Sequence, residues 1–439
     1  MSNKTLPLYF FCIFAAYIKT MTPHPPAVEK FNKYQVITIV ILALTQFTVV
    51  LDFMVMSPLG DMLMKSMGLT TSQFGFAVSS YAFSAAIAGF LTAGFADKFD
   101  RKKLLLFFYI GFIIGTLMCS LATNYSMLIT ARIVTGLFGG VIGSISLAIV
   151  ADLFPIQKRG RVMGYLQMGF GASQVLGIPI SLYIANYWNW EAPFMMIVIF
   201  AVVIWLLIAW KLQPINKHLL IKSDKNAFLH LWHTIAKREY RVGFLTTALL
   251  SLGGFMMMPW GSAFAINNLK VTPSQLPIMF MVGGISSLII MPLIGRLSDR
   301  FEKLKVFTYA SIWMATVVVI YTNMSADPFY FILIMNVAMM IGIMSRMVPA
   351  MALNSALPEM QDRGAFMSVN SSLQQFAGGI AAAIGGMVVV QQTKTSPIEN
   401  YNILGYFILV LSVINILMVY RLSKIVNRKN AERAASAKA

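Results

Sequence analysis

Long apolar blocks alternate with short polar stretches along almost the whole chain. Each block approaches the roughly 20 helical residues that cross a hydrocarbon core of about 30 Å. Because an open strand in lipid cannot satisfy its own backbone, the blocks predict membrane-spanning helices. The twelve predicted spans are Val36–Met56, Phe74–Phe95, Leu104–Leu121, Met127–Ala151, Val162–Ala185, Phe194–Trp210, Val242–Ile266, Leu276–Leu297, Val306–Tyr321, Phe329–Leu353, Phe366–Val390 and Ile403–Tyr420.

A polar, basic stretch divides these spans into two sets of six. The predicted regions are an N-terminal cytoplasmic tail at 1–35, a six-helix bundle at 36–210, a cytoplasmic linker at 211–241, a second bundle at 242–420 and a basic cytoplasmic tail at 421–439. The first region holds a short apolar run, Leu6–Ile18, without a small-residue cleavage site after it. We interpret this run as an interfacial segment or as an upstream start that is not used, because a cleaved signal peptide needs that site.

Composition and charge agree with a polytopic membrane protein. The 439 residues are 58% hydrophobic and 11% charged, with a mean hydropathy of +0.73, whereas a soluble domain is about 25% charged. The loops after even-numbered spans and the C-terminal tail hold 25 of the 34 Lys and Arg residues. This bias places both termini in the cytoplasm. The net charge of +18 therefore reflects membrane orientation and not nucleic-acid binding.

The chain repeats itself after about 200 residues. The stretch GFADKFDRKK at 94–103 follows the second span, and GRLSDRFEKLK at 295–305 follows the eighth. A second pair, LFPIQKRGRVMG at 153–164 and ALPEMQDRGAFMS at 356–368, shares proline, Arg-Gly and methionine. The chain is thus predicted to be a duplicated six-helix unit.

These spans and repeated loops resemble the major facilitator superfamily, whose transporters bind substrate near the membrane midplane between two repeats. The resemblance implies an all-α polytopic membrane protein with 12 transmembrane helices in two pseudo-symmetric six-helix bundles. Arg132 and the glycines at 136, 139 and 140 are similar to a pattern of proton-coupled members. The stretch Gly171–Pro179 is similar to the antiporter pattern, with Ile178 between its glycine and proline. The first-span stretch LDFMVMSPLG resembles bacterial drug:proton antiporters and arabinose-efflux permeases.

The charged loop after the second span is implied by the resemblance to act as a conformational latch. In the family, the acid of this loop meets the start of the eleventh span and joins the two bundles on the cytoplasmic side. The corresponding residues are Gly94, Asp97, Arg101 and Lys102, with Gly295, Asp299 and Arg300 as the second copy. The alternative is an ordinary positive-inside loop.

Asp52 and Arg132 are the candidates for proton coupling. Each lies about five residues, or roughly 7 Å, from the outer end of its predicted span. An isolated charge at this depth costs several kcal/mol, so pairing is expected. A carboxylate beside an arginine can exchange its proton for substrate when its two forms favour different conformations. The alternatives are a static ion pair that holds the helices together, and an Asp52 side chain that reaches the outer interface.

Polar and aromatic side chains of spans 1, 4, 5, 7, 10 and 11 are candidates for a substrate cavity. They are Gln46, Gln167, Gln174, Trp260, Asn336, Arg346, Asn370 and Gln374. Some of them are expected to form helix–helix hydrogen bonds instead. Arg346 is expected either to bind an anionic group or to extend toward the cytoplasm. The 31 methionines suit an adaptable pocket for apolar ligands.

The sequence therefore predicts a secondary active transporter that works by alternating access, with proton-coupled efflux of small apolar or amphiphilic compounds. The alternative within the fold is a sugar or other metabolite permease, for efflux or uptake, and the alternative class is a transport-inactive membrane receptor. Neither a phosphate-binding glycine loop nor a catalytic or metal-ligand cluster is evident, so we expect no enzyme activity, no cofactor and no metal. The expected partners are a small-molecule substrate, protons and the bilayer of the bacterial cytoplasmic (inner) membrane, with no nucleic acid, and a monomer is expected.

Overall fold

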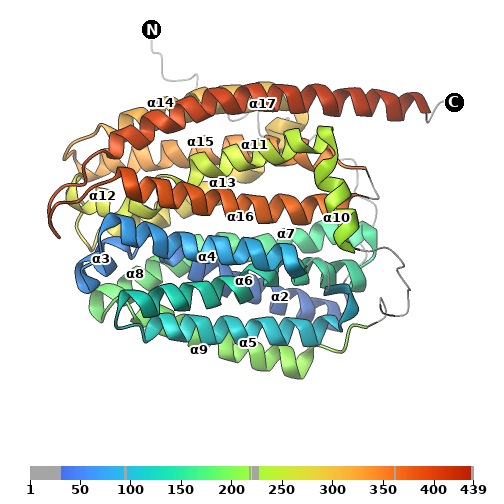
Figure 1. The fold of residues 1–439 in the computed structure, drawn as a ribbon, viewed down its shortest axis with the longest axis horizontal. Coiled ribbons are helices and arrows are strands. Elements are labelled where there is room, and N and C mark those ends of the chain that lie inside the picture. Colours follow the sequence, from blue (N-terminus) through green and yellow to red (C-terminus); the bar gives the residue numbers. More distant parts are fainter. Residues whose placement is uncertain (1–30, 93–95, 217–218, 220–226, 360–361, 437–439) are drawn as a thin grey trace, which may run out of the picture.

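Two bundles of long, nearly parallel helices lie side by side (Figure 1). The computed structural model describes residues 31–92, 96–216, 219, 227–359 and 362–436. The apolar run Leu6–Ile18 lies outside these residues. Within the described part of the chain, eleven helices are long and apolar enough to cross a membrane. The expected all-helical membrane fold is therefore confirmed.

The first bundle contains the first six spans. Its elements are α2 (Lys33–Val55), α3 (Gly60–Met67), α4 (Thr71–Thr92), the short 3-10 helix η1 (Ala96–Lys98), α5 (Arg101–Ser120), α6 (Tyr125–Leu153), α7 (Ile156–Ala172), the π-helical turn η2 (Ser173–Gly177), α8 (Ile178–Tyr187) and α9 (Ala192–Lys211). The first span is α2, which the short α3 follows, and α7, η2 and α8 together form the fifth. A π-helical turn changes the direction of the fifth span just before Pro179.

The second bundle repeats this arrangement. Its elements are α11 (Arg238–Phe255), the 3-10 helix η4 (Met258–Trp260), α12 (Gly261–Asn267), α13 (Leu276–Arg300), α14 (Lys303–Thr322), α15 (Phe329–Ala356), α16 (Arg363–Val388) and α17 (Tyr401–Ser436). The helix α16 is the eleventh span in chain order and is not among the eleven strongly apolar helices, yet its 26 residues measure about 39 Å. It is less apolar than the others because Asn370, Gln374 and several serines interrupt it.

A short helix, α3, follows the apolar helix of the first span. A turn at 56–59 containing Pro58 ends α2, and α3 then continues to Met67, where Gly68 adopts a left-handed conformation (φ 66°). The apolar helix of the first span ends at Val55, one residue before the predicted end at Met56. Asp52 thus lies three residues before the end of α2, and α3 follows on its outer side.

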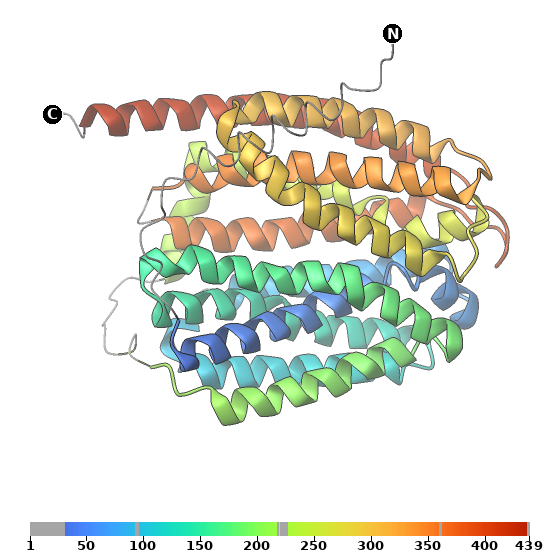
Figure 2. The ribbon, with the colours of Figure 1, turned by 180° about the vertical axis from the view of Figure 1, so that it is seen from behind.

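Two extensive helix contacts join the bundles, besides smaller ones such as that of α3 with α12. The helix α4 packs along α16, and η2 with α8 packs against α13, which Figure 2 shows as the yellow helix beside the green ones. A Cβ atom added to Gly75 on α4 would lie 2.9 Å from the Ala382 carbonyl oxygen and 3.2 Å from the Gly386 Cα on α16. Glycine at position 75 thus allows the two backbones to touch near the outer side.

The predicted linker contains a helix that docks on the second bundle. This helix, α10 (Ala227–Ala236), runs across the ends of the long helices (Figure 1). Its Leu231 is buried in a cluster with Tyr240 and Phe366. Just after α10, the Lys237 ammonium lies 2.5 Å from the Asp362 carboxylate, and the Tyr240 hydroxyl donates to the same carboxylate at 2.8 Å. The linker helix is therefore part of the second bundle.

The Lys237–Asp362 pair is expected to hold α10 in place. The hydrogen bond to Asp362 raises the pKa of Lys237, so the pair contributes fully below the unfolded pKa of about 10.4 and is lost only as pH rises above it. Asp362→Ala leaves the Tyr240 hydroxyl without its acceptor, which costs about 1–3 kcal/mol. We expect amide hydrogen exchange in α10 to become at least fivefold faster at pH 7. Glu432→Ala, on the exposed end of α17, is the control, and equal exchange in all three proteins would contradict the docking role.

Candidate functional site

Asp52 and Arg132 form an ion pair inside the first bundle. The Arg132 Nη1 donates to Asp52 Oδ2 at 3.0 Å, and both side chains are 0% exposed. The Thr116 hydroxyl on α5 donates to the other carboxylate oxygen at 3.1 Å. Three helices, α2, α5 and α6, thus contribute to one polar site. The expected pairing is present, and the complete burial of Asp52 is incompatible with a side chain at the outer interface.

Packing around the guanidinium encloses the pair. The Arg132 Cζ lies 4.5 Å from the centroid of the Tyr81 ring on α4. One turn further along α6, a Cβ atom added to Gly136 would lie 2.4 Å from the Tyr81 carbonyl oxygen. Glycine is therefore required for α4 to approach this closely. The Nε and Nη2 atoms of Arg132 are buried without a hydrogen-bond partner, so Asp52 supplies the ionic contact of the guanidinium.

A second polar site closes the outer side between the bundles. We call it the outer gate and define it by Ser57, Asp61 and Lys65 of the first bundle with Ser262 and Asn267 of the second. The Asn267 amide donates to Asp61 at 2.6 Å, and the Lys65 ammonium donates to Asp61 at 2.7 Å and to Asn267 at 3.3 Å. The Ser262 hydroxyl donates to the Ser57 carbonyl at 2.7 Å. A pocket of about 480 Å³ borders this gate and includes Asp61 and Lys65.

Sequence reasoning missed the outer gate, although the internal repeat contains a signal for it. Lys65 and Asn267 are 202 residues apart, which is the offset between the two copies. Equivalent positions of the first and seventh spans meet at the pseudo-symmetry axis. Polar residues at matching positions near the outer ends of these spans therefore predict a contact between the bundles.

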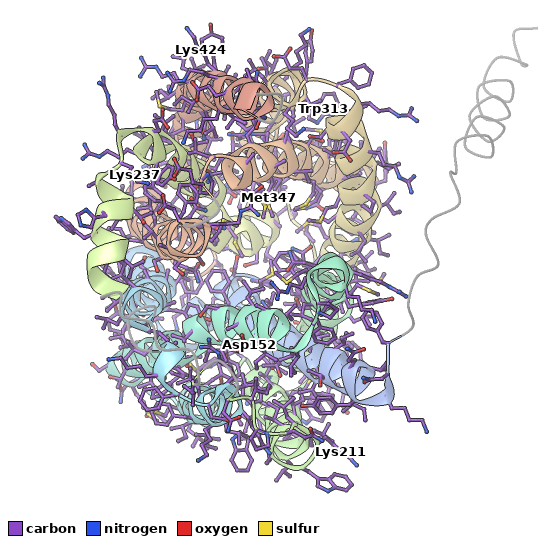
Figure 3. All side chains as sticks on the ribbon, turned by 90° about the vertical axis from the view of Figure 1, so that its right-hand side faces the viewer. Asp152, Lys211, Lys237, Trp313, Met347 and Lys424 are labelled. Carbon is purple, nitrogen blue, oxygen red and sulfur yellow. The ribbon has the colours of Figure 1, made fainter. Side chains whose placement is uncertain are left out.

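The predicted latch residues lie at the opposite end of the helices. Gly94 lies outside the described residues, and only the backbone of Asp97 is described, within η1. The Arg101 Nε donates to the Asp152 carboxylate on α6 at 3.0 Å, and Lys102 donates to the Ala209 carbonyl at 2.8 Å. Figure 3 views this end, with Asp152 in the first bundle and Lys237 in the second. Arg101 thus contacts its own bundle in this conformation.

The second copy of the latch is more open. A Cβ atom added to Gly295 would have no other atom within 4 Å. Asp299 and Arg300, at the end of α13, are exposed. In the first copy the side chain of Arg101 is buried and bonded, whereas Asp299 and Arg300 of the second copy face outward.

The predicted cavity residues are dispersed over both bundles. Gln167 and Gln374 are exposed, and Gln46 and Gln174 are half-buried. Trp260 is fully buried with its ring against Phe74, so it does not line an accessible surface in this conformation.

Two further candidates of the second bundle serve in helix packing. Asn370 accepts hydrogen bonds from Thr247 at 2.7 Å and Asn354 at 2.9 Å, and so links α11, α15 and α16. Asn336 is buried, and a Cβ atom added to Gly283 on α13 would lie 2.7 Å from its side-chain oxygen. Arg346 is buried as well, at 7% exposure.

Two relatives with curated names align over more than half of this chain. The "Uncharacterized MFS-type transporter YbcL" of Bacillus subtilis (strain 168) is 23% identical over 376 residues, covering 85% of this chain and 94% of the relative. A "Probable sugar efflux transporter" of Helicobacter pylori (strain P12) is 26% identical over 271 residues, covering 61% of this chain and 68% of the relative. Both are distant relatives.

Solved structures and a family model also match this chain. The inward-facing, unoccupied structure of a bacterial homolog of the human lysosomal transporter Spinster has a TM-score of 0.72 at 14% identity, covering 91% of this chain and 99% of that chain. A D-xylose-proton symporter has a TM-score of 0.71 at 17% identity, covering 87% of this chain and 97% of that chain. Likeness at these identities shows the fold alone. The family model described as "Major Facilitator Superfamily" matches residues 42–382 and 243–439. The chain therefore belongs to the major facilitator superfamily and is a membrane transporter, not an enzyme.

Proposed function

We propose that this transporter couples the inward movement of protons to the efflux of small apolar or amphiphilic compounds. The observation that carries this proposal is the completely enclosed ion pair between Asp52 and Arg132. Among the acidic residues that the structure describes, Asp52 is the most deeply buried, at 0% exposed. Ionisable residues inside the membrane are expensive and typically mark proton or substrate pathways.

The coupling follows from the charge of the site. When Asp52 takes up a proton, Arg132 loses its counter-charge while it remains protonated. An uncompensated buried charge costs several kcal/mol. The protonated protein therefore favours a conformation in which Arg132 reaches water or another acceptor. A change in relative stability of this size is sufficient to shift the population between two conformations.

Alternating access uses the two ends of the bundle interface in turn. The outer gate is closed in the conformation described above, which corresponds to the inward-facing state of the proposed cycle. Opening the outer gate breaks the contacts of Asp61 and Lys65 with Asn267. In the outward-facing state, Asp97 and Arg101 are proposed to join the first bundle to the start of α16, as the latch of the family does.

A second candidate is efflux of a sugar or another polar metabolite. The relatives named as probable sugar efflux transporters favour it. The exposed amides of Gln167 and Gln374 are suited to hydrogen bonds with hydroxyl groups. Since the relatives are bacterial, we place the protein in a bacterial cytoplasmic membrane, as a monomer with both termini inside.

Transport by purified protein in liposomes tests both candidates. Liposomes with an imposed pH gradient are loaded with either a lipophilic fluorescent dye or radiolabelled sugars. We expect the gradient to accelerate dye transport at least tenfold over protein-free liposomes, with proton movement recorded by an internal pH indicator. Gradient-driven movement of a sugar alone would replace the first candidate by the second. Substrate movement that ignores the gradient would exclude proton coupling.

A further inference from the structure

Arg346 is a second arginine enclosed by a bundle, and its environment differs from that of Arg132. Only 7% of the residue is exposed, and its Nε is fully buried without a hydrogen-bond partner. It forms no hydrogen bond or ion pair with another described residue. The Arg346 Cζ lies 5.8 Å from the centroid of the Phe307 ring on α14. Because a guanidinium keeps its proton in proteins, this largely buried residue carries a full positive charge.

The register of α14 and α15 places Ser311 at the height of Arg346. The two helices are antiparallel, and a Cβ atom added to Gly342 on α15 would lie 3.0 Å from the Met314 Cβ on α14. This contact pairs Gly342 with Met314. Three residues further along α15 and three residues back along α14, the same register pairs Ser345, the neighbour of Arg346, with Ser311. Ser311 is 0% exposed, and its hydroxyl has no hydrogen-bond partner.

The register of α14 and α17 brings Asn415 to the same height. A Cβ atom added to Gly405 on α17 would lie 2.5 Å from the Thr322 Oγ1 on α14, and these helices are also antiparallel. This contact pairs Gly405 with Thr322. Eleven residues further along α17 and eleven residues back along α14, the same register pairs Ile416, the neighbour of Asn415, with Ser311. Asn415 is 0% exposed, and neither its amide nitrogen nor its oxygen has a partner. Ser412, one turn outward, is 2% exposed and also unpartnered.

We call Ser311, Arg346, Ser412 and Asn415 the Arg346 layer. The layer lies on the outward side of a buried apolar cluster that contains Phe307 and Val419. Its guanidinium, two hydroxyls and one amide are all hydrogen-bond donors. Three helices that pack on one another therefore place these donors at about the same height.

No carboxylate is available to balance the charge of this layer. The acidic residues of the second bundle and its loops lie at helix ends or between helices: Glu239, Asp299, Glu302, Asp327, Glu359, Asp362, Glu399 and Glu432. Leaving a buried charge unpaired costs several kcal/mol. Water could satisfy the hydrogen bonds but could not neutralise the charge, and a metal cation would be repelled.

We propose that the Arg346 layer binds a small monovalent anion of the halide class, such as chloride. The enclosure by α14, α15 and α17 favours a bare ion over the carboxylate of a larger solute. The anion supplies the counter-charge in the second bundle that Asp52 supplies in the first. The site goes beyond the proposed transport reaction and does not depend on it.

Thermal unfolding of the full-length purified protein tests the anion site. The Tm is measured against chloride concentration, with gluconate keeping the ionic strength constant. A ligand that binds the folded state alone raises stability with the logarithm of its concentration. We expect this rise with chloride and with bromide in the wild type, and its loss in Arg346→Met. Ser311→Ala and Asn415→Leu are expected to need at least fivefold more chloride for the same Tm shift.

A matched control separates a built site from general effects of salt. Ser298→Ala removes an equally buried, unpartnered hydroxyl outside the layer, on α13, and should respond to chloride as the wild type does. An absent chloride response in the wild type would overturn the proposal. A response that persists unchanged in Ser311→Ala, Asn415→Leu and Arg346→Met would also overturn it. A stronger response to acetate than to chloride would assign the layer to organic carboxylates instead.

Discussion

Asp52→Asn is expected to lower proton-driven transport at least a hundredfold while substrate exchange without a gradient continues. Asparagine has nearly the same shape, but it cannot take up or release the proton. Arg132 stays buried and charged without a counter-ion, a situation that costs about 3–5 kcal/mol when a buried pair is broken. The measurement compares uphill transport under a pH gradient with equilibrium exchange of labelled substrate in the same liposomes.

A double variant separates coupling from a purely structural role of the pair. Asp52→Asn with Arg132→Gln removes both charges, and replacing both partners of a buried pair is far less costly than removing one. We expect the double variant to regain most of the thermal stability lost in Asp52→Asn and to remain uncoupled. Thr116→Val, which removes only the hydrogen bond to Asp52, should keep coupling. If the double variant regained proton-driven transport together with stability, the pair would be a static contact.

The pairing of Asp52 with Arg132 could be predicted from sequence because both charges interrupt otherwise apolar spans. A charge in such a position must find a partner, and few are available. The short helix α3 could not be predicted from apolar length, since the polar Asp61 and Lys65 interrupt the apolar run. Apolar length alone misses a helix whose polar side chains face the other bundle.

The substrate cavity was harder to predict than the fold. Trp260 and Asn370 have the residue types and positions expected for a cavity. Trp260, however, is buried in packing, and Asn370 forms hydrogen bonds to two neighbouring helices. A polar residue inside a span faces either a cavity or another helix, and the hydrophobic period does not distinguish these faces in a bundle buried on several sides. The docking of α10 could not be predicted either. Lys237, which directly follows α10, bonds to Asp362, 125 residues away, and the sequence pattern does not show such a distant pair.

Cross-linking the outer gate is expected to abolish transport in either proposed function. Asp61→Cys with Asn267→Cys, in a background that lacks Cys12 and Cys119, replaces two side chains that are 2.6 Å apart. A short bifunctional thiol reagent then joins α3 of the first bundle to α12 of the second. Because outward opening must separate these helices, we expect transport to fall at least a hundredfold after cross-linking and to recover after cleavage of the linker by a reductant.

The same reagent on one helix provides the matched control. Asp61→Cys with Lys65→Cys places both thiols on α3, four residues apart, so the cross-link perturbs the outer gate without joining the bundles. We expect this protein to keep most of its transport after treatment. Binding of substrate from the cytoplasmic side should persist in the cross-linked gate variant, since the gate is already closed in the inward-facing state. Full transport by the cross-linked gate variant would show that the contact of Asp61 with Asn267 need not open, and that access to the outside follows another route.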